Sequence, residues 1–156
     1  MSQAMTMKRI AKEEKDMTDD PIPNVIIKRK GDFTFHFCVY GLSAPYEGGI
    51  YHGRVELHNN YPFEPPKILM VTPSGRFAPD QPICTTFSHY HKESWSAAWS
   101  IRTIVLGFLS FMLENGHGIG SLMDSDAKKK EYAKKSFEFN NKNKDFVELF
   151  KEDLKK

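Results

Sequence analysis

Residues 33–40 read Phe-Thr-Phe-His-Phe-Cys-Val-Tyr, and they decide how this chain folds. Apolar side chains occupy every second position, with His36 and Cys38 among the residues between them. Because the side chains of a strand point alternately to its two faces, this period of two predicts a β-strand. Residues 51–58 alternate in the same way, and residues 67–71 form a short apolar run. We therefore expect successive strands of an antiparallel meander with one buried face.

Helical patterns lie on both sides of these strands. Residues 6–18 space their apolar side chains for a helix, which Asp20-Pro21 ends. Ser100 is placed to cap an apolar helix, and a charged helix follows over residues 126–139. The apolar stripe expected on this charged helix consists of Ala127, Ala133 and Phe137. A last helix is expected to carry on one side Phe146, Leu149, Phe150 and Leu154. The order of elements predicts an α+β fold, as one domain over residues 1–156.

The composition excludes several classes of protein. The 156 residues carry 22 basic and 20 acidic side chains, and 40% of the residues are hydrophobic. This balance excludes a coiled coil, a disordered tail and a miniprotein held by disulfides. Both ends of the chain are basic and the middle is acidic, so nucleic acid is not an expected partner. The chain has two cysteines and no signal segment, which predicts a reducing, cytoplasmic environment.

Residues 72–99 have no regular period and are expected to form a long loop, which in a compact domain is often functional. Cys84 lies in this loop behind rigid prolines and is a candidate nucleophile, whereas Cys38 is expected to be a small buried hydrophobe. His89 and His91 follow Cys84 closely enough to reach its thiol, as in a Cys/His hydrolase. The histidines expected on the polar faces of strands are His36, His52 and His58. Their spacing matches no metal site.

Several motifs in order resemble those of the ubiquitin-conjugating enzymes. They are Lys8–Glu13, Asp20-Pro21, Tyr46-Glu47-Gly48-Gly49, Tyr61-Pro62-Phe63-Glu64-Pro65-Pro66-Lys67, Ile83-Cys84 and Trp95. The resemblance covers roughly residues 5–153. It implies the fold of that family, with an N-terminal helix, a four-stranded antiparallel meander, a long active-site loop and C-terminal helices.

One branch of the family is especially similar. Most members have a His-Pro-Asn before the cysteine, whereas this chain has Thr-Pro-Ser-Gly-Arg-Phe over residues 72–77 and a wide gap between Cys84 and Trp95. These features resemble the tail-anchored enzymes of endoplasmic-reticulum quality control, in which Asn stands at the place of Ser74. In that branch a membrane anchor follows the catalytic domain. This chain stops at Lys156 without one, so it is either shortened or has lost the anchor. We expect membrane contact only through such an anchor, at the cytosolic face of the endoplasmic reticulum.

The resemblance implies acyl transfer through a cysteine thioester. Cys84 would accept ubiquitin from an activating enzyme and pass it to a substrate lysine or, in this branch, to a hydroxyl. Attack on the thioester puts negative charge on the carbonyl oxygen, which needs a hydrogen-bond donor. Ser74 could be such a donor, and His91 either assists the chemistry or only orders the loop. No metal or bound cofactor is expected, because ATP is used by the activating enzyme.

The resemblance also implies two partner surfaces. The surface for the activating enzyme would consist of Lys8, Arg9 and Lys12. The surface for a RING-type ligase would consist of Phe63, Ser96, Ala97 and Ala98. The alternatives are a solvated helix face for the basic residues and a packed turn for Phe63. We expect an active conjugating enzyme in endoplasmic-reticulum-associated degradation; an inactive ubiquitin-binding scaffold of the same fold and a Cys/His hydrolase are the other function classes.

Overall fold

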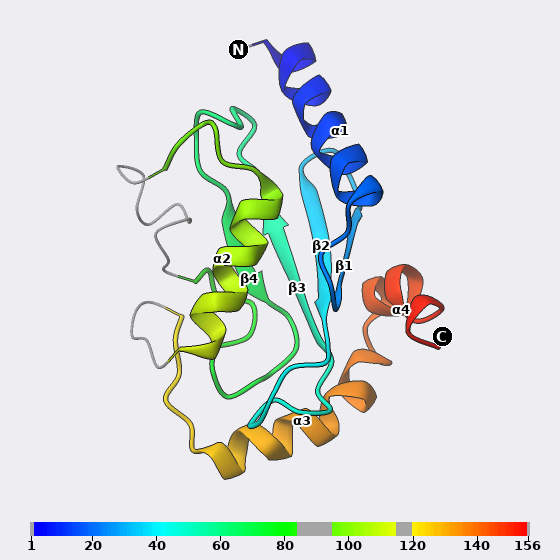
Figure 1. The fold of residues 1–156 in the computed structure, drawn as a ribbon, viewed down its shortest axis with the longest axis vertical. Helices are drawn as coiled ribbons and strands as arrows, with labels where there is room; N and C mark the ends of the chain where they lie inside the picture. The colour runs from blue at the N-terminus through cyan, green and yellow to red at the C-terminus, as the bar shows by residue number, and fades with distance from the viewer. Residues whose placement is uncertain (1, 84–94, 115–119, 156) are drawn as a thin grey trace.

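A computed structural model describes residues 2–83, 95–114 and 120–155 (Figure 1). The chain begins with helix α1 and continues into a sheet of four strands. Three helices and a short 3-10 helix complete the described part. The elements are α1 (Gln3–Asp19), β1 (Val25–Arg29), β2 (Thr34–Val39), β3 (Tyr51–Glu56), β4 (Lys67–Met70), α2 (Ile101–Leu113), α3 (Asp126–Asn140), α4 (Lys144–Phe150) and the 3-10 helix Asp153–Lys155.

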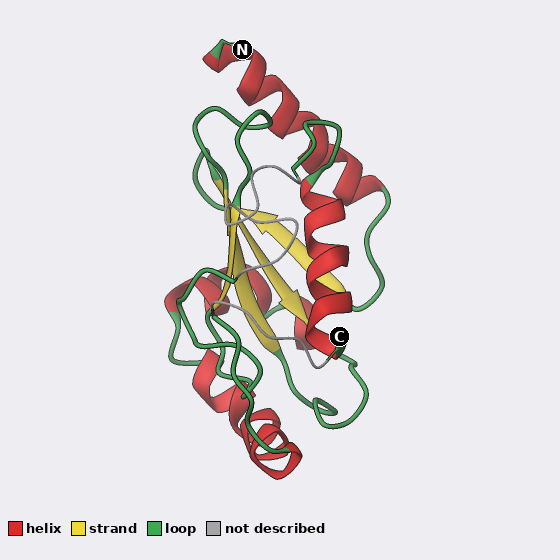
Figure 2. Ribbon diagram, turned by 90° about the vertical axis from the view of Figure 1, so that its left-hand side faces the viewer, coloured by secondary structure: helices red, strands yellow, loops and turns green. Residues whose placement is uncertain are grey.

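The four strands form one antiparallel sheet in the order β1-β2-β3-β4, so each strand pairs with its neighbour in sequence. Together with the N-terminal and C-terminal helices, this meander confirms the expected α+β architecture (Figure 2). The strands predicted from alternation appear as β2 and β3, and the apolar run appears as β4. The alternation did not predict β1, because its sequence Val-Ile-Ile-Lys-Arg does not alternate.

Helix α2 packs on one face of the sheet and closes the main core. The β2 side chains on this face include Phe35 and Phe37, and both are buried. The Phe37 ring lies 5.4 Å from the Phe108 ring of α2. Ser100 caps α2 as predicted, since its hydroxyl accepts the backbone N–H of Thr103.

The opposite face of the central strands is also buried, so the expectation of one polar face is wrong. Helix α4 covers this face, and its Phe146 and Phe150 pack with Cys38 in a second hydrophobic cluster. His36 and His52 lie under the same helix and are almost completely buried. His36 Nδ1 and His52 Nε2 are 2.7 Å apart, so each imidazole satisfies a polar atom of the other. Burial lowers the pKa of both histidines, that of His52 to about 3.

Helix α3 lies at one end of the sheet, against the chain before β3 and after β4, and its inner side chains are mainly polar, which corrects the predicted apolar stripe. The inward residues are Lys129, Ala133, Ser136 and Asn140. Phe137 is instead 49% exposed, and Ala127 is exposed as well. Asn140 donates to the carbonyl of Ile50, and Ser136 accepts the backbone N–H of Ile50. Because α3 packs against backbone groups that need hydrogen-bond partners, polar side chains replace apolar ones on its inner face.

Candidate active site and partner surfaces

The predicted nucleophile Cys84 and the predicted helper His91 lie outside the described residues. The chain directly before Cys84 is firmly held. Ile83 is completely buried, and its backbone N–H donates to the carbonyl of Ile68 in β4 at 2.9 Å. The described residues between β4 and α2 form no helix or strand beyond one bridge between Phe77 and Ser121, in agreement with the expected long loop.

Cys38 is buried, as expected, and it is unsuited to nucleophilic chemistry. It has no exposed surface, and burial raises the pKa of its thiol to about 12. Only the thiolate attacks a carbonyl, and at neutral pH a thiol with this pKa is almost entirely protonated. Of the two cysteines in the chain, only Cys84 is left as a candidate acyl carrier.

Ser74 lies in a buried turn of the chain between β4 and Cys84. The side chain is completely buried. Its hydroxyl oxygen accepts the backbone N–H groups of Arg76 at 3.1 Å and Phe77 at 3.4 Å. The intervening Gly75 has a φ of +80°, a conformation that favours glycine. The hydroxyl therefore closes this turn, while its own hydrogen is not used by these two bonds. Its service as a donor to the thioester oxygen stays a prediction.

Arg76 is a buried residue of this region that the sequence reasoning missed. Its guanidinium donates to backbone carbonyls at the end of α2, those of Phe111 at 2.8 Å, Met112 at 3.3 Å and Glu114 at 3.1 Å. It also donates to the Ser121 hydroxyl at 3.2 Å. The last carbonyls of a helix have no intrahelical partner, and Arg76 supplies one. The segment before Cys84 is thereby tied to α2 and to the chain around residue 121.

The basic residues of α1 differ in their surroundings. Lys8 and Lys12 are exposed, as a docking surface for an acidic partner requires. Arg9 is only partly exposed, and its Nε donates to Glu13 at 2.8 Å. Its Nη2 donates to the carbonyl of Trp99 at 2.8 Å. Arg9 therefore connects α1 to the chain before α2, a role that could not be predicted from the sequence.

The predicted ligase surface is formed by two segments that lie far apart in sequence. Phe63 is 54% exposed and does not pack into its own turn. Ala98 is exposed, and Ser96 and Ala97 are partly buried. The indole of Trp95 donates to the carbonyl of Pro62 at 2.7 Å, which joins the two segments directly. The structure thus brings together the predicted ligase-binding residues, without showing what they bind.

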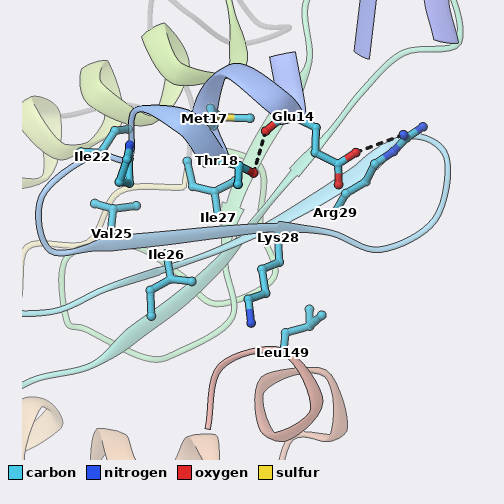
Figure 3. Close-up of a pocket in the computed structure, with 11 residues that line it drawn as sticks. Glu14, Met17, Thr18, Ile22, Val25, Ile26, Ile27, Lys28, Arg29 and Leu149 are labelled. Carbon is cyan, nitrogen blue, oxygen red and sulfur yellow. Dashed lines mark hydrogen bonds and ion pairs between the residues drawn. The ribbon is translucent and has the colours of Figure 1, made fainter. Parts of the chain in front are cut away.

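A groove with a volume of about 480 Å³ lies between α1, β1 and α4 (Figure 3). Its lining is mainly apolar, with Met17, Ile22 and Leu149 among the contributors. Arg29 and Glu14 form an ion pair of 3.5 Å at its edge. Among the described residues that line this groove there is no cysteine or histidine.

The described part of the chain lacks two further features. No group of three or more His, Cys, Asp or Glu side chains there is arranged to hold a metal ion. No helix there combines the length and apolar character needed to cross a membrane.

Comparison with known proteins gives consistent results. Residues 9–147 match the ubiquitin-conjugating enzyme family. The chain is 43% identical over 145 residues to "Ubiquitin-conjugating enzyme E2 J2-like" of Dictyostelium discoideum, covering 91% of this chain and 85% of that protein. It is 41% identical over 143 residues to "Ubiquitin-conjugating enzyme E2 6" of Eremothecium gossypii, covering 90% of this chain and 59% of the other.

The mouse "Ubiquitin-conjugating enzyme E2 J2" is 42% identical over 134 residues, covering 85% of this chain and 49% of the mouse protein. The chain thus spans about half of several curated relatives and most of another. The family match, these relatives and the architecture agree. The chain belongs to the ubiquitin-conjugating enzymes, a family of ubiquitin transferases that work between an activating enzyme and a ligase.

Proposed function

We propose that this protein carries ubiquitin as a thioester on Cys84 and transfers it to a substrate lysine. One observation carries the choice of residue. A ubiquitin transferase of this family needs a reactive thiol, and the chain has two cysteines. Cys38 is buried under α4 with a pKa of about 12, so Cys84 is the remaining candidate.

The proposed reaction has two acyl transfers. In the first, the Cys84 thiolate attacks the carbonyl carbon of ubiquitin bound to the activating enzyme's cysteine; a new C–S bond forms and the donor cysteine leaves as a thiolate. In the second, a substrate amine attacks the Cys84 thioester, an amide bond forms, and Cys84 leaves as a thiolate. A hydroxyl acceptor would give an ester by the same steps. The first transfer is nearly balanced in energy, so the protein mainly has to position the sulfur.

The surroundings of Cys84 would assist the second transfer. Ser74 would donate its free hydroxyl hydrogen to the developing oxyanion, and His91 would supply a further donor or accept the proton of the amine. The hydrogen bonds that Ser74 accepts from Arg76 and Phe77 support this proposal in part, because they fix the oxygen and leave the O–H free to point elsewhere.

The resemblance to the tail-anchored branch supports a narrower role. The protein would act with a RING-type ligase in endoplasmic-reticulum-associated degradation, at the cytosolic face of that membrane. Phe63 with residues 96–98 would bind the ligase, and the basic residues of α1 would bind the activating enzyme. The exposure of Phe63, Lys8 and Lys12 is consistent with these roles. Separation of microsomes from cytosol would test the location of the natural protein.

A loading assay tests the central step. The protein is mixed with activating enzyme, ATP and labelled ubiquitin, and adducts are compared with and without reductant. We expect a reductant-sensitive adduct that Cys84→Ala abolishes and Cys38→Ala retains. A folded protein that forms no adduct would point instead to an inactive ubiquitin-binding scaffold of the same fold.

A further inference from the structure

A buried carboxylate lies between the two predicted partner surfaces. Glu13 of α1 is only 6% exposed, yet it is an acidic residue. Its Oε2 accepts the Tyr61 hydroxyl at 2.6 Å and Arg9 Nε at 2.8 Å. Its Oε1 accepts the backbone N–H of Ile101 at 2.7 Å. Burying a carboxylate is costly unless it is well paired, and these three donors supply that pairing.

Two of the three donors lie next to the residues of the predicted ligase surface: Tyr61 precedes Phe63, and Ile101 follows Ala98. Tyr61 is completely buried and is the second residue of the turn over residues 60–63, in which the Phe63 N–H donates to the carbonyl of Asn60. Burial and the neighbouring Glu13 carboxylate both raise the pKa of Tyr61, so its hydroxyl stays protonated and continues to donate. Ile101 is the first residue of α2, and its N–H has no partner within the helix. A negative charge is also favourable at the N-terminus of this 13-residue helix.

Arg9 extends the same network to the segment before α2. It donates to Glu13 and to the carbonyl of Trp99, and its guanidinium lies 5.7 Å from the centre of the Tyr61 ring. The rings of Trp99 and Trp95 contact edge to face at 5.6 Å. Trp95 in turn donates to the carbonyl of Pro62, which follows Tyr61. The contacts thus form a closed circuit, which runs from Glu13 through Arg9, Trp99, Trp95 and Pro62 to Tyr61 and back to Glu13.

We propose that Glu13 is a positioning residue for the ligase step: its carboxylate holds the 61–63 turn and the 95–101 segment in the relative placement that a ligase recognises. The inference rests on the proposed function of these two segments. Glu13 does not touch the ligase, because it is buried beneath the surface residues. Its effect passes through Tyr61 and Ile101, whose positions set those of Phe63 and Ala98.

The variants follow from the geometry. Glu13→Gln keeps the size of the side chain and one acceptor oxygen, but its amide nitrogen only donates, so either Arg9 or the Ile101 N–H loses its acceptor. Tyr61→Phe removes one of the three donors and leaves the charge. Phe146→Leu serves as the control, because it removes packing in the second hydrophobic cluster, which contains no residue of either segment, and lowers stability.

The experiment compares two discharge rates for each variant. The purified ubiquitin thioester is mixed with free lysine, with and without an isolated RING domain that stimulates discharge from the unaltered protein. The readout is the ratio of the stimulated rate to the unstimulated rate, which cancels any general loss of activity. Urea unfolding of each variant gives its stability, and protection of the Trp95 indole hydrogen from exchange reports on its bond to Pro62.

We expect Glu13→Gln to lower the stimulation ratio about tenfold, since displacements of about 1 Å can cost that much or more in a positioned complex. Tyr61→Phe should lower it less, and both variants should reduce protection of the Trp95 indole hydrogen. Phe146→Leu should leave the ratio unchanged at a similar loss of stability. An unchanged ratio in Glu13→Gln, or an equal fall in Phe146→Leu, would overturn the positioning role.

The measurements distinguish failure of the positioning role from failure of the proposed function or of the ligase surface. If no thioester forms on the unaltered protein, the proposed function is wrong. If Phe63→Ala keeps full stimulation, or no RING domain stimulates the unaltered protein, the ligase surface is wrong and the positioning role is overturned with it. If Phe63→Ala removes stimulation and Glu13→Gln does not, only the positioning inference is wrong.

Discussion

The hydroxyl of Ser74 serves a structural purpose and is also available for chemistry. Its oxygen accepts two backbone N–H groups and so closes the turn before Phe77. A serine hydroxyl has one hydrogen to donate besides its acceptor capacity. Ser74 can therefore hold the turn and donate at the same time, whereas an alanine can do neither.

We expect Ser74→Ala to slow the discharge of preloaded ubiquitin to free lysine by up to about 100-fold, because one donor to an oxyanion often contributes that much. The measurement starts from purified thioester, so the loading step does not enter. Loss of the two hydrogen bonds that Ser74 accepts from Arg76 and Phe77 should also lower the free energy of unfolding by about 1 kcal/mol. Equal discharge rates for the variant and the unaltered protein would remove Ser74 from the mechanism.

Single residues show what could be predicted from the sequence and what could not. The burial of Cys38 is predicted correctly from its residue type, since a free cysteine in a strand usually acts as a small buried hydrophobe. The alternation alone places it with His36 on the face that was expected to be polar. The role of Glu13 could not be predicted, since its partners Tyr61 and Ile101 lie 48 and 88 residues away along the chain. Arg76 gave no signal either, because its carbonyl partners at the end of α2 are brought near only by the fold.

Among the elements, α2 depends on a residue outside it. Arg76 bonds to three carbonyls at its C-terminal end, so this helix is capped by the segment that leads to Cys84. Arg76→Met should lower the free energy of unfolding by about 3 kcal/mol, since it leaves buried carbonyls unpaired. Urea unfolding measures this loss. Arg76→Lys should be nearly as costly, because one ammonium cannot replace the planar guanidinium; full stability in Arg76→Lys would contradict the account.

Helix α4 buries a histidine pair, which makes stability depend on pH. The pKa of His52 falls to about 3 and that of His36 is also lowered, mainly through burial, while unfolded histidines titrate near 6.5. Below pH 6.5 the unfolded chain therefore binds protons that the folded protein excludes. The stabilisation is complete above this pH and is lost as the pH falls towards 3.

We expect His52 to lower the free energy of unfolding by up to about 1.4 kcal/mol per pH unit between pH 6 and 4, and His36 to add to this fall in the same direction. Urea unfolding over this range measures the slope. The double variant His36→Leu/His52→Leu removes both titrating groups and keeps apolar volume under α4, so its slope should be smaller by that amount. The same slope in both proteins would show that other groups cause the acid sensitivity.

The elements also show why pattern reasoning has limits. The period of two in residues 33–40 fixes which side chains share a face, but not what covers that face. Burial of the second face comes from α4, about 100 residues later in the chain, and the sequence pattern contained no information on this docking. In α3 the expected apolar stripe was wrong because the helix packs against polar backbone groups around Ile50.

At the scale of the whole molecule, α1 and α3 lie at opposite ends, and both carry exposed lysines (Figure 1). The proposed docking of an acidic domain concerns α1 only. Since Arg9 is engaged within the fold, the exposed residues of the predicted set that can meet such a partner are Lys8 and Lys12. Complementary charge mainly raises the rate of encounter, and salt screens it.

Lys8→Glu/Lys12→Glu should therefore slow loading by the activating enzyme about tenfold at low salt, with a smaller effect at high salt. Lys128→Glu/Lys130→Glu in α3 is the matched control, because it changes the net charge by the same amount at the other end of the molecule. Initial rates of thioester formation provide the measurement. Equal slowing by both variants would assign the effect to net charge and not to a surface on α1.

The central claim is that ubiquitin is carried on Cys84, and the variant Cys84→Ser tests it most directly. A serine at this position would form an oxygen ester, which reductant does not cleave and mild base does. After incubation with activating enzyme, ATP and ubiquitin, the account predicts an adduct on Cys84→Ser that survives reductant. Intact mass spectrometry would show it as the mass of the variant plus that of ubiquitin, less one water. Cys38→Ser should still give the reductant-sensitive adduct. A reductant-sensitive adduct on Cys84→Ser, or its loss in a folded Cys38→Ser, would contradict the account.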